Sequence, residues 1–480
     1  MGIEKFFSSI KKNEVSDKFI KDFKRTDTEH FYIDFNSIVY TYGHKQVQYE
    51  LNYILNSIIN KNNNNKLLKL CNKYNIKTNI TLDEFKKKFT DDHVDNVIVN
   101  KVIDYIKKML KEYIISNNLL FFYIAIDGVP SKSKMITQKI RRYNGTLMSF
   151  VNKKIYEKHK KDIKKNINRY IYEENRISWN RGKISPGTLF MDKINNKLSN
   201  DRFINEIKLI CPNLKKYIFS GSYEPGEGEK KIVDHLRTLK NIKSKYLIYS
   251  PDSDVILLSL LLNTKFNDIN NQKIYSLKML RHNQQKNNYN IIDIDNFGDE
   301  LYNYVFSKIG NNKLDRDYIV NDIVFIYTIF GNDFLPKIES VNVKYDFFEI
   351  INIYCIILKK LKGKINFNYL IFYSKKDGLK NINHLFFFNL IKELQMDEGG
   401  RLYKVYMQNN YINYDKIKKK LKSSDIDFKK NIEDFLNKLK KFNKDISLSS
   451  KKDDLNKWLK NDLSFINKLM NFSNLRVDNP

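Results

Sequence analysis

The chain is poor in cysteine and has no long apolar run. Cys71, Cys211 and Cys355 lie far apart, so neither a zinc knuckle nor a disulfide framework is available. This cysteine usage is typical of a reducing compartment. Apolar runs such as residues 350–358 are too short and too interrupted to span a bilayer, and no signal peptide opens the sequence. These absences predict a soluble protein with no membrane contact, located in the cytoplasm or, as the alternative, the nucleus.

The chain is strongly basic. Its 480 residues include 85 lysines and arginines against 55 acids, which gives a formal net charge of +30. Such a charge favours a polyanionic partner, and nucleic acid is a better candidate than a membrane surface. Lys, Asn and Ile are abundant throughout, as in proteins from AT-rich genomes, so charge alone discriminates little. The placement of the acids in this basic background is more informative.

Acidic residues follow four segments that have the composition of buried strands, and one more follows an apolar helical run. In an open α/β sheet, the carboxyl ends of parallel strands share one crevice. The sequence therefore predicts an α/β fold, with a central, mostly parallel sheet flanked by helices. It also predicts that the carboxylates lie close together at the carboxyl ends of the strands. The seven acids are Asp34, Asp127, Glu227, Glu229, Asp252, Asp254 and Asp333.

Seven carboxylates in one crevice repel each other unless cations neutralise them. All-oxygen ligands suit Mg²⁺ or Mn²⁺, so we expect a site for two such ions, of the kind used in phosphodiester hydrolysis. Asp252 and Asp254 are expected to lie on an extended segment and to point the same way. For Glu227 and Glu229 an alternative is simple stabilisation of a helix start by charge.

A basic helical segment follows Asp127. Lys134, Gln138, Arg141 and Arg142 have spacings that place them within about a third of a helix circumference. Such a face could hold a terminal phosphate beside the acids, and the alternative is an ordinary solvated helix face. The basic and aromatic residues of 151–181 are better explained by an exposed helix than by a nucleic-acid surface.

The length allows two parts. Residues 1–340 contain the strand and acid motifs and are predicted to form a nuclease core. Residues 341–480 change to aromatic and aliphatic helical segments followed by a Lys-rich stretch, which predicts a helical C-terminal region packed on the core. No internal repeat or long linker separates the two.

Taken in order, these motifs resemble those of the Xrn-type 5′-3′ exoribonucleases, whose catalytic core is related to the PIN and flap-endonuclease folds. Each motif alone is weak, but the ordered set, which extends to about residue 340, is specific. The matching segments are residues 1–3 (MGI), 33–38 (IDFNSI), 125–129 (AIDGV) with Lys134 and Met135, 185–188 (SPGT), 221–230 (GSYEPGEGEK), 252–254 (DSD) and 332–336 (NDFLP).

The resemblance implies roles for the site residues. The seven acids would be the metal-binding catalytic set, and the four residues of the basic helix would form a pocket for a 5′-monophosphate that rejects a cap or a triphosphate. The family commonly carries a histidine six residues after the first catalytic Asp; Tyr40 stands there, and an aromatic ring can still stack on the 5′ base. The family's distal Trp/Tyr-rich motif is not found, and the chain has only Trp179 and Trp458.

The resulting hypothesis is a monomeric 5′-3′ exoribonuclease that hydrolyses single-stranded RNA carrying a 5′-monophosphate to nucleoside monophosphates. A flap-type DNA 5′-nuclease is the first alternative, although the Gly-rich hairpin expected soon after the last acidic motif is absent: the next glycine after Pro336 is Gly363. A non-catalytic RNA-binding protein is the second, but conserving seven costly acids without catalysis would be unexpected. The compact length and AT-biased composition would suit a large DNA virus.

Overall fold

The fold is taken from a computed structural model. The residues that it describes are 6–11, 16–239, 243–266, 273–283, 288–310, 314–331, 335, 338, 340–341, 343–361, 369–373, 380–396 and 398–402. Within these ranges some side chains, that of Arg141 among them, lie outside the description.

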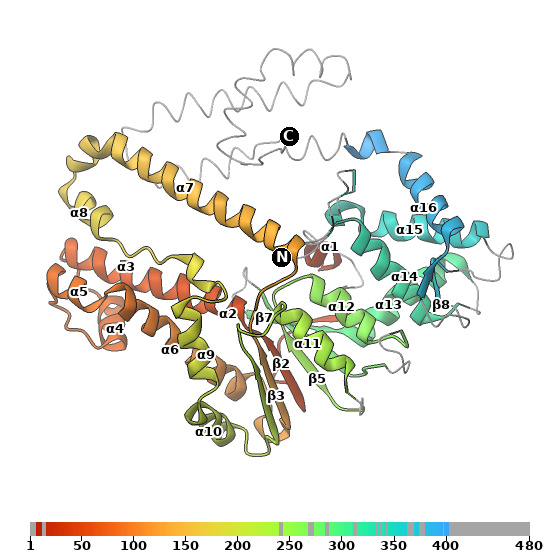
Figure 1. Ribbon diagram of the computed structural model, residues 1–480, viewed down its shortest axis with the longest axis horizontal. Coiled ribbons are helices and arrows are strands. Elements are labelled where there is room, and N and C mark those ends of the chain that lie inside the picture. Colours follow the sequence, from red (N-terminus) through yellow and green to blue (C-terminus); the bar gives the residue numbers. More distant parts are fainter. Residues whose placement is uncertain are drawn as a thin grey trace, which may run out of the picture. The chain divides into compact units, whose positions relative to one another are not determined.

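A seven-stranded sheet forms the centre of the fold (Figure 1). Its strands lie in the order β1-β7-β6-β5-β2-β3-β4. Neighbours from β6 to β4 run parallel, whereas β7 pairs antiparallel with both β6 and β1. The predicted α/β fold with a mostly parallel sheet is therefore confirmed. The strands are β1 (Ile20–Asp22), β2 (His30–Asp34), β3 (Phe121–Ala125), β4 (Lys216–Ser220), β5 (Tyr246–Tyr249), β6 (Leu277–Asn283) and β7 (Asn288–Asp293).

One face of the sheet is covered by helices from the first half of the chain (Figure 1). Because side chains alternate along a strand, Phe31 and Ile33 of β2 share a face. Both belong to a buried apolar cluster that also contains Leu51, Ile98 and Phe190 from three of these helices. The covering helices are α3 (Gln46–Ile59), α4 (Asn65–Tyr74), α5 (Leu82–Lys88), α6 (Asp91–Glu112), α9 (Leu189–Leu198) and α10 (Asp201–Ile210).

The opposite face of the sheet packs against helices from residue 228 onward. Tyr32 of β2 points to this side, where its hydroxyl lies 3.3 Å from Nδ1 of His235. The helices that follow the strands here are α11 (Gly228–Arg237), α12 (Asp254–Leu262), α13 (Ile294–Ile309) and α14 (Arg316–Ile329). Helix α12 is apolar on nearly all sides, as expected for a helix enclosed by others.

The basic segment after Asp127 forms a helical hairpin. Helix α7 (Lys132–Lys164) is continuous over 33 residues, and α8 (Ile167–Asn175) folds back beside its far end (Figure 1). The hydroxyl of Tyr156 donates a hydrogen bond to Glu174, and Lys160 pairs with the same carboxylate at 2.9 Å. These aromatic and basic side chains thus contribute to the packing of the two helices.

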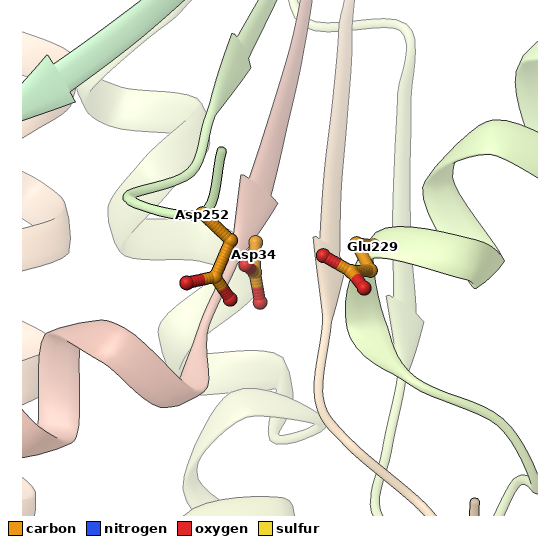
Figure 2. A group of neighbouring side chains, drawn as sticks. All are labelled: Asp34, Glu229 and Asp252. Atoms are coloured by element: carbon orange, nitrogen blue, oxygen red, sulfur yellow. The ribbon is translucent and has the colours of Figure 1, made fainter. Parts of the chain in front are cut away.

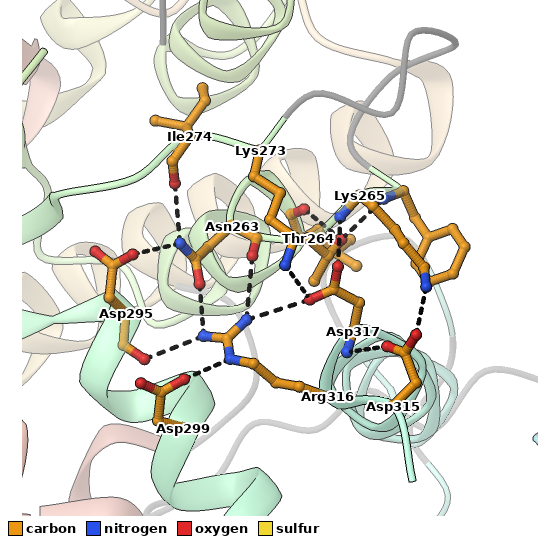
Figure 3. A network of polar contacts seen from close by, with 12 residues as sticks. Asn263, Thr264, Lys265, Lys273, Ile274, Asp295, Asp299, Asp315, Arg316 and Asp317 are labelled. Carbon is orange, nitrogen blue, oxygen red and sulfur yellow. Dashed lines mark hydrogen bonds and ion pairs between the residues drawn. The ribbon is translucent and has the colours of Figure 1, made fainter. Parts of the chain in front are cut away.

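A polar network fixes helix α14, which leads toward the predicted Asp333 loop (Figure 3). Arg316 donates to the side chain and the main-chain oxygen of Asn263 at 2.7 and 3.2 Å, and also to the carboxylate of Asp299. A Cβ on Gly298 would lie 2.3 Å from the guanidinium, so only glycine lets α13 approach Arg316 this closely. The network therefore joins the end of α12 to α13 and α14.

The chain divides into two compact units. The first groups residues 1–337 with 343–390, and the second groups 338–342 with 391–480. Residues 403–480 lie outside the described part, and with them the Lys-rich stretch that was predicted to be helical and Trp458. The division at residue 340 stays a prediction. Further described elements include α1 (Phe6–Lys11), α15 (Val343–Leu361), β8 (Ile371–Tyr373), β9 (Lys380–Ile382) and α16 (His384–Met396).

Strands β1 and β7 were not predicted. β1 has only three residues, two of them exposed, and β7 is interrupted by polar side chains, so neither carries a clear apolar alternation. Both lie on the antiparallel side of the sheet, away from the strand ends that carry the acids. In the described part of the chain, no helix is both long and apolar enough to cross a membrane.

Candidate active site

Parallel strand ends bring the predicted acids to one edge of the sheet. Asp34 is the last residue of β2, and Asp127 lies two residues beyond the end of β3. Glu227 immediately precedes helix α11, which follows β4, and Asp252 lies three residues beyond the end of β5. Since β5, β2, β3 and β4 are consecutive and in register, their ends lie side by side.

Three of the carboxylates approach each other closely enough to share a metal ion. One oxygen each of Asp34, Glu229 and Asp252 lies within 4.8 Å of the others (Figure 2). We call these three residues the carboxylate cluster. Asp34 is buried, while Glu229 and Asp252 are half-buried, so a cation bound here would keep limited access to solvent.

Asp34 and Glu229 are not stable as neighbouring anions. Burial, followed by the charges of Asp127 and Asp252, raises the pKa of Asp34 well above its ordinary value. Burial, followed by the charges of Asp34 and Asp252, does the same for the pKa of Glu229. Oε2 of Glu229 is buried and has no hydrogen-bond partner in the described part of the chain. A buried oxygen with no donor, beside other carboxylates, fits a divalent cation as the missing partner.

Asp127 is held in place beside the cluster. The main-chain NH of Gly228 donates to Oδ1 at 2.8 Å, and the side-chain amide of Asn36 donates to Oδ2 at 2.9 Å. A Cβ on Gly228 would lie 3.0 Å from both the carbonyl oxygen of Ala125 and Oδ1 of Asp34. Glycine at residue 228 therefore lets the start of α11 approach the ends of β2 and β3 closely, since a side chain there would force its neighbours to move by a few tenths of an ångström.

Glu227 pairs with the first residue of the predicted basic face. Nζ of Lys134 lies 3.2 Å from Oε1 of Glu227. Glu227 occupies the position before the first turn of α11 but makes no side-chain capping hydrogen bond. A capping hydrogen bond therefore does not hold Glu227, while the ion pair with Lys134 and the favourable interaction of a carboxylate with a helix start both act on it.

The other two acids give different outcomes. Asp254 opens helix α12, and Ser253 before it has helical torsion angles, so residues 252–254 are not extended as expected from the sequence. Its charge still reaches the cluster, since Asp254 contributes to raising the pKa of Glu229. Asp333 lies outside the described residues.

The predicted basic face is only partly solvated. Lys134 is buried, Gln138 is half-buried, and Arg142 is exposed. Arg142 donates to Oε1 of Gln138 at 3.2 Å, so these two side chains lie together, one and two turns beyond Lys134. The side chain of Arg141 is outside the description. The face thus extends from Lys134, which is buried beside the acids, to Arg142, which is exposed to solvent.

Tyr40 lies in a π-helical segment, η2 (Val39–Lys45), that continues α2 (Asn36–Ile38) into α3. Its side chain is partly exposed, and its hydroxyl accepts a hydrogen bond from Arg181 at 2.9 Å. π-Helical turns are rare and occur often at functional sites.

Three further residues support the acids and were not predicted from the sequence as site residues. The buried hydroxyl of Ser250 donates to Oδ2 of Asp34 at 2.8 Å, and Asn36 holds Asp127 as described above. Arg281 on β6 lies next to Ser250 in register and has a buried Nη1 without a hydrogen-bond partner in the described part of the chain. Burial lowers the pKa of Arg281 to about 10, against the opposing charges of Asp252 and Asp254. β6 also carries Lys278, His282 and Asn283, so no pattern in the sequence marked Arg281.

Comparison with known proteins agrees with this geometry. Residues 64–272 match the family model described as the XRN 5′-3′ exonuclease N-terminus. An Acanthamoeba polyphaga mimivirus protein named as a 5′-3′ exonuclease is 34% identical over 258 residues, which are 52% of this chain and 39% of that protein. The Saccharomyces cerevisiae 5′-3′ exoribonuclease 1 is 27% identical over 304 residues, which are 56% of this chain and 17% of that protein.

The human 5′-3′ exoribonuclease 1 gives a similar match, with 26% identity over 292 residues, or 57% of this chain and 16% of that protein. The matched region thus spans less than half the length of each of these relatives. The family match and these relatives show that this part of the chain is similar to the N-terminal nuclease region of the Xrn 5′-3′ exonucleases, and the acids at the parallel strand ends agree with that similarity.

Proposed function

We propose that this protein is a metal-dependent 5′-3′ exoribonuclease that acts on single-stranded RNA with a 5′-monophosphate and releases nucleoside monophosphates. The observation that carries the proposal is the carboxylate cluster, whose three oxygens lie within 4.8 Å of one another at the ends of parallel strands. The names of the matched relatives support the same reaction class.

Asp34, Glu229 and Asp252 are the proposed metal ligands, with Asp127, Glu227, Asp254 and Asp333 completing the catalytic acids. Two Mg²⁺ or Mn²⁺ ions, when bound, would supply activation of water and stabilisation of the leaving 3′ oxygen. The protein's own part is to position the ligands. Ser250 fixes one oxygen of Asp34, and Gly228 with Asn36 fixes both oxygens of Asp127.

Substrate binding is assigned to the residues next to these acids. Lys134, Gln138, Arg141 and Arg142 would hold the 5′-phosphate, and Tyr40 would stack on the first base. Lys134 can serve this role because its ion pair with Glu227 places an ammonium group directly beside the acids. A pocket of one lysine, one amide and two arginines suits a monophosphate in size and charge.

The proposed setting is a monomer in the cytoplasm. Three free, buried cysteines are in keeping with a reducing compartment. The C-terminal region from residue 341 onward is proposed to pack on the nuclease core.

The test compares RNAs that differ only at the 5′ end. Single-stranded RNAs with a 5′-monophosphate, 5′-triphosphate or 5′-hydroxyl are incubated with the protein and Mg²⁺, and products are resolved by size. We expect mononucleotides from the monophosphate RNA alone, and none when EDTA replaces Mg²⁺ or when Asp252 is changed to Asn. Preferred cleavage of a labelled DNA flap would favour the DNA nuclease instead, and RNA binding without cleavage in Mg²⁺ would favour a non-catalytic role.

A further inference from the structure

Tyr40 belongs to a cluster of hydrogen-bonded side chains that lies outside the acidic motifs. Arg181 is the first residue of η4 (Arg181–Ile184), in the connection between α8 and α9, and it reaches across to η2. Its Nη1 donates to the hydroxyl of Tyr40 at 2.9 Å, and its Nε donates to Nε2 of His44 at 3.2 Å. Two directional bonds from one planar guanidinium fix the orientation of both partners.

The inner partner of Arg181 is rigidly supported. His44 is buried and lies against Trp179, with ring centroids 5.1 Å apart. Nε1 of Trp179 donates to Asp95 at 2.5 Å, and Lys183 pairs with the same carboxylate at 2.9 Å. Burial, together with the charges of Arg181 and Lys45, lowers the pKa of His44 to about 4, so its ring stays neutral and can accept from Arg181 near neutral pH.

The outer partner remains accessible. Tyr40 is 38% exposed, and Cζ of Arg181 lies 5.3 Å from the centroid of its ring. Nζ of Lys45 lies 5.9 Å from the same centroid. An exposed aromatic ring with two cations within 6 Å of its centroid is a suitable surface for a nucleotide, since the base stacks on the ring and the cations attract its phosphates. Holding the hydroxyl of an exposed tyrosine with an ordered arginine costs side-chain entropy. A ligand that binds the ordered ring would offset this cost.

We propose that Arg181 is a positioning residue that fixes the ring of Tyr40 as a stacking platform for the first base of the RNA. The inference rests on the proposed function. It also gives Trp179 a role: the ring is buried beneath His44, so it supports the platform and does not itself contact a base.

The test uses RNA with a 5′-monophosphate and 2-aminopurine as the first base, because stacking quenches the fluorescence of this base. Binding is measured with EDTA, so that no cleavage occurs. The variants are Arg181→Ala, Tyr40→Phe, their combination, and Tyr40→Ala. Arg176→Ala is the matched control, since it removes one positive charge from the same connection and its side chain is also largely exposed.

We expect quenching by the unchanged protein and a loss of affinity of roughly tenfold in Tyr40→Ala, as is usual for removal of a base-stacking ring. Arg181→Ala should lose roughly threefold or more, with weaker quenching and an unchanged melting temperature. In Tyr40→Phe the hydroxyl anchor is already gone, so adding Arg181→Ala should cost less than twofold. Arg181→Lys should recover part of the quenching, and Arg176→Ala should behave as the unchanged protein.

Three results would overturn the inference: no quenching by the unchanged protein, normal quenching in Arg181→Ala, or additive losses in the double variant. Cleavage of the same RNA with Mg²⁺ is followed in parallel. If the unchanged protein cleaves while Arg181→Ala binds and quenches normally, only the role of Arg181 fails. If the unchanged protein does not cleave, the proposed function fails, whatever the binding measurements give.

Discussion

The ammonium of Lys134 lies 3.2 Å from Oε1 of Glu227, and each of the two side chains is only 9% exposed. This ion pair joins helix α7, which carries the proposed phosphate pocket, to the start of α11, which carries two of the acids. Removal of one partner from a buried pair leaves the other charge uncompensated. The contact therefore couples the stability of the fold to the charge balance of the site.

Lys134→Met should destabilise the metal-free protein. The loss of the ammonium leaves Glu227 buried without its partner, which typically costs about 3 kcal/mol of unfolding free energy. Mg²⁺ should restore part of the loss, because a bound cation again offsets the carboxylates. Thermal unfolding with EDTA and with Mg²⁺ measures both effects. Lys132→Met is the control, since Lys132 is exposed on the same first turn; equal melting temperatures for the two variants would contradict the prediction.

Asp34→Asn should separate stability from activity. Neutralising Asp34 removes the cost of burying its charge and the repulsion from Asp127 and Asp252, which together raise its pKa. One pKa unit corresponds to about 1.4 kcal/mol, so the metal-free variant should melt at a higher temperature. Degradation of 5′-monophosphate RNA should fall by about 10³-fold, which corresponds to a loss of about 4 kcal/mol of charge stabilisation. Asp104→Asn, at an exposed position in α6, serves as the control. A variant that is both more stable and fully active would show that Asp34 is not a metal ligand.

The pKa directions at Asp34 and Glu229 predict how stability depends on pH. Both pKa values are raised by burial and by neighbouring carboxylates, so the folded state keeps protons that the unfolded chain releases. The stability of the metal-free protein should therefore fall as pH rises above about 4, the ordinary range for carboxyl groups, until the folded-state values are passed.

Divalent cations should reverse this trend. A cation binds ionised carboxylates and competes with their protons, so the increase in melting temperature caused by Mg²⁺ should grow with pH. Thermal unfolding between about pH 5 and pH 8, with EDTA or Mg²⁺, measures it. A Mg²⁺ effect that is independent of pH, or that persists in an Asp34→Asn/Asp252→Asn protein, would argue against metal binding at the carboxylate cluster.

Gly228→Ala should damage the site more than the fold. The added methyl group would lie 3.0 Å from Ala125 O and from Oδ1 of Asp34, so the start of α11 must shift away from the strand ends. Overpacking of this kind costs about 1–3 kcal/mol, and we expect a larger relative loss in Mg²⁺ affinity and RNA degradation. Gly145→Ala is the matched control: its Cβ would meet nothing within 4 Å, and alanine should stabilise helix α7 by about 0.5–1 kcal/mol. Equal Mg²⁺ affinities for the two variants would contradict this assignment.

The sequence was a good guide to the strands that carry acids. β2, β3 and β5 are short apolar runs that end just before the acids, and this pattern arises because both faces of a central parallel strand are buried while its end meets the site. β4, at the edge of the sheet, is only partly buried. β1 and β7 were missed because their composition is not typical of strands. They are strands because β7 pairs antiparallel with β1 and with β6.

The sequence was less reliable for individual side chains. Helical spacing grouped Lys134 with Arg142 on one face, but spacing could not show that Lys134 is buried against Glu227 while Arg142 is exposed. Ser250 and Arg281 carried no motif, and their place beside the acids follows from the pairing of β5 with β2 and β6.

The residue pattern of each segment was enough to predict that acids follow buried strands, because an apolar run and the acid after it can be recognised within the segment itself. Only the tertiary structure decided that Asp34, Glu229 and Asp252 share one small space and that Arg181 reaches Tyr40. These contacts join residues up to 218 positions apart (34 to 252), so they depend on the order in which strands cross over within the sheet, and no local pattern encodes that order.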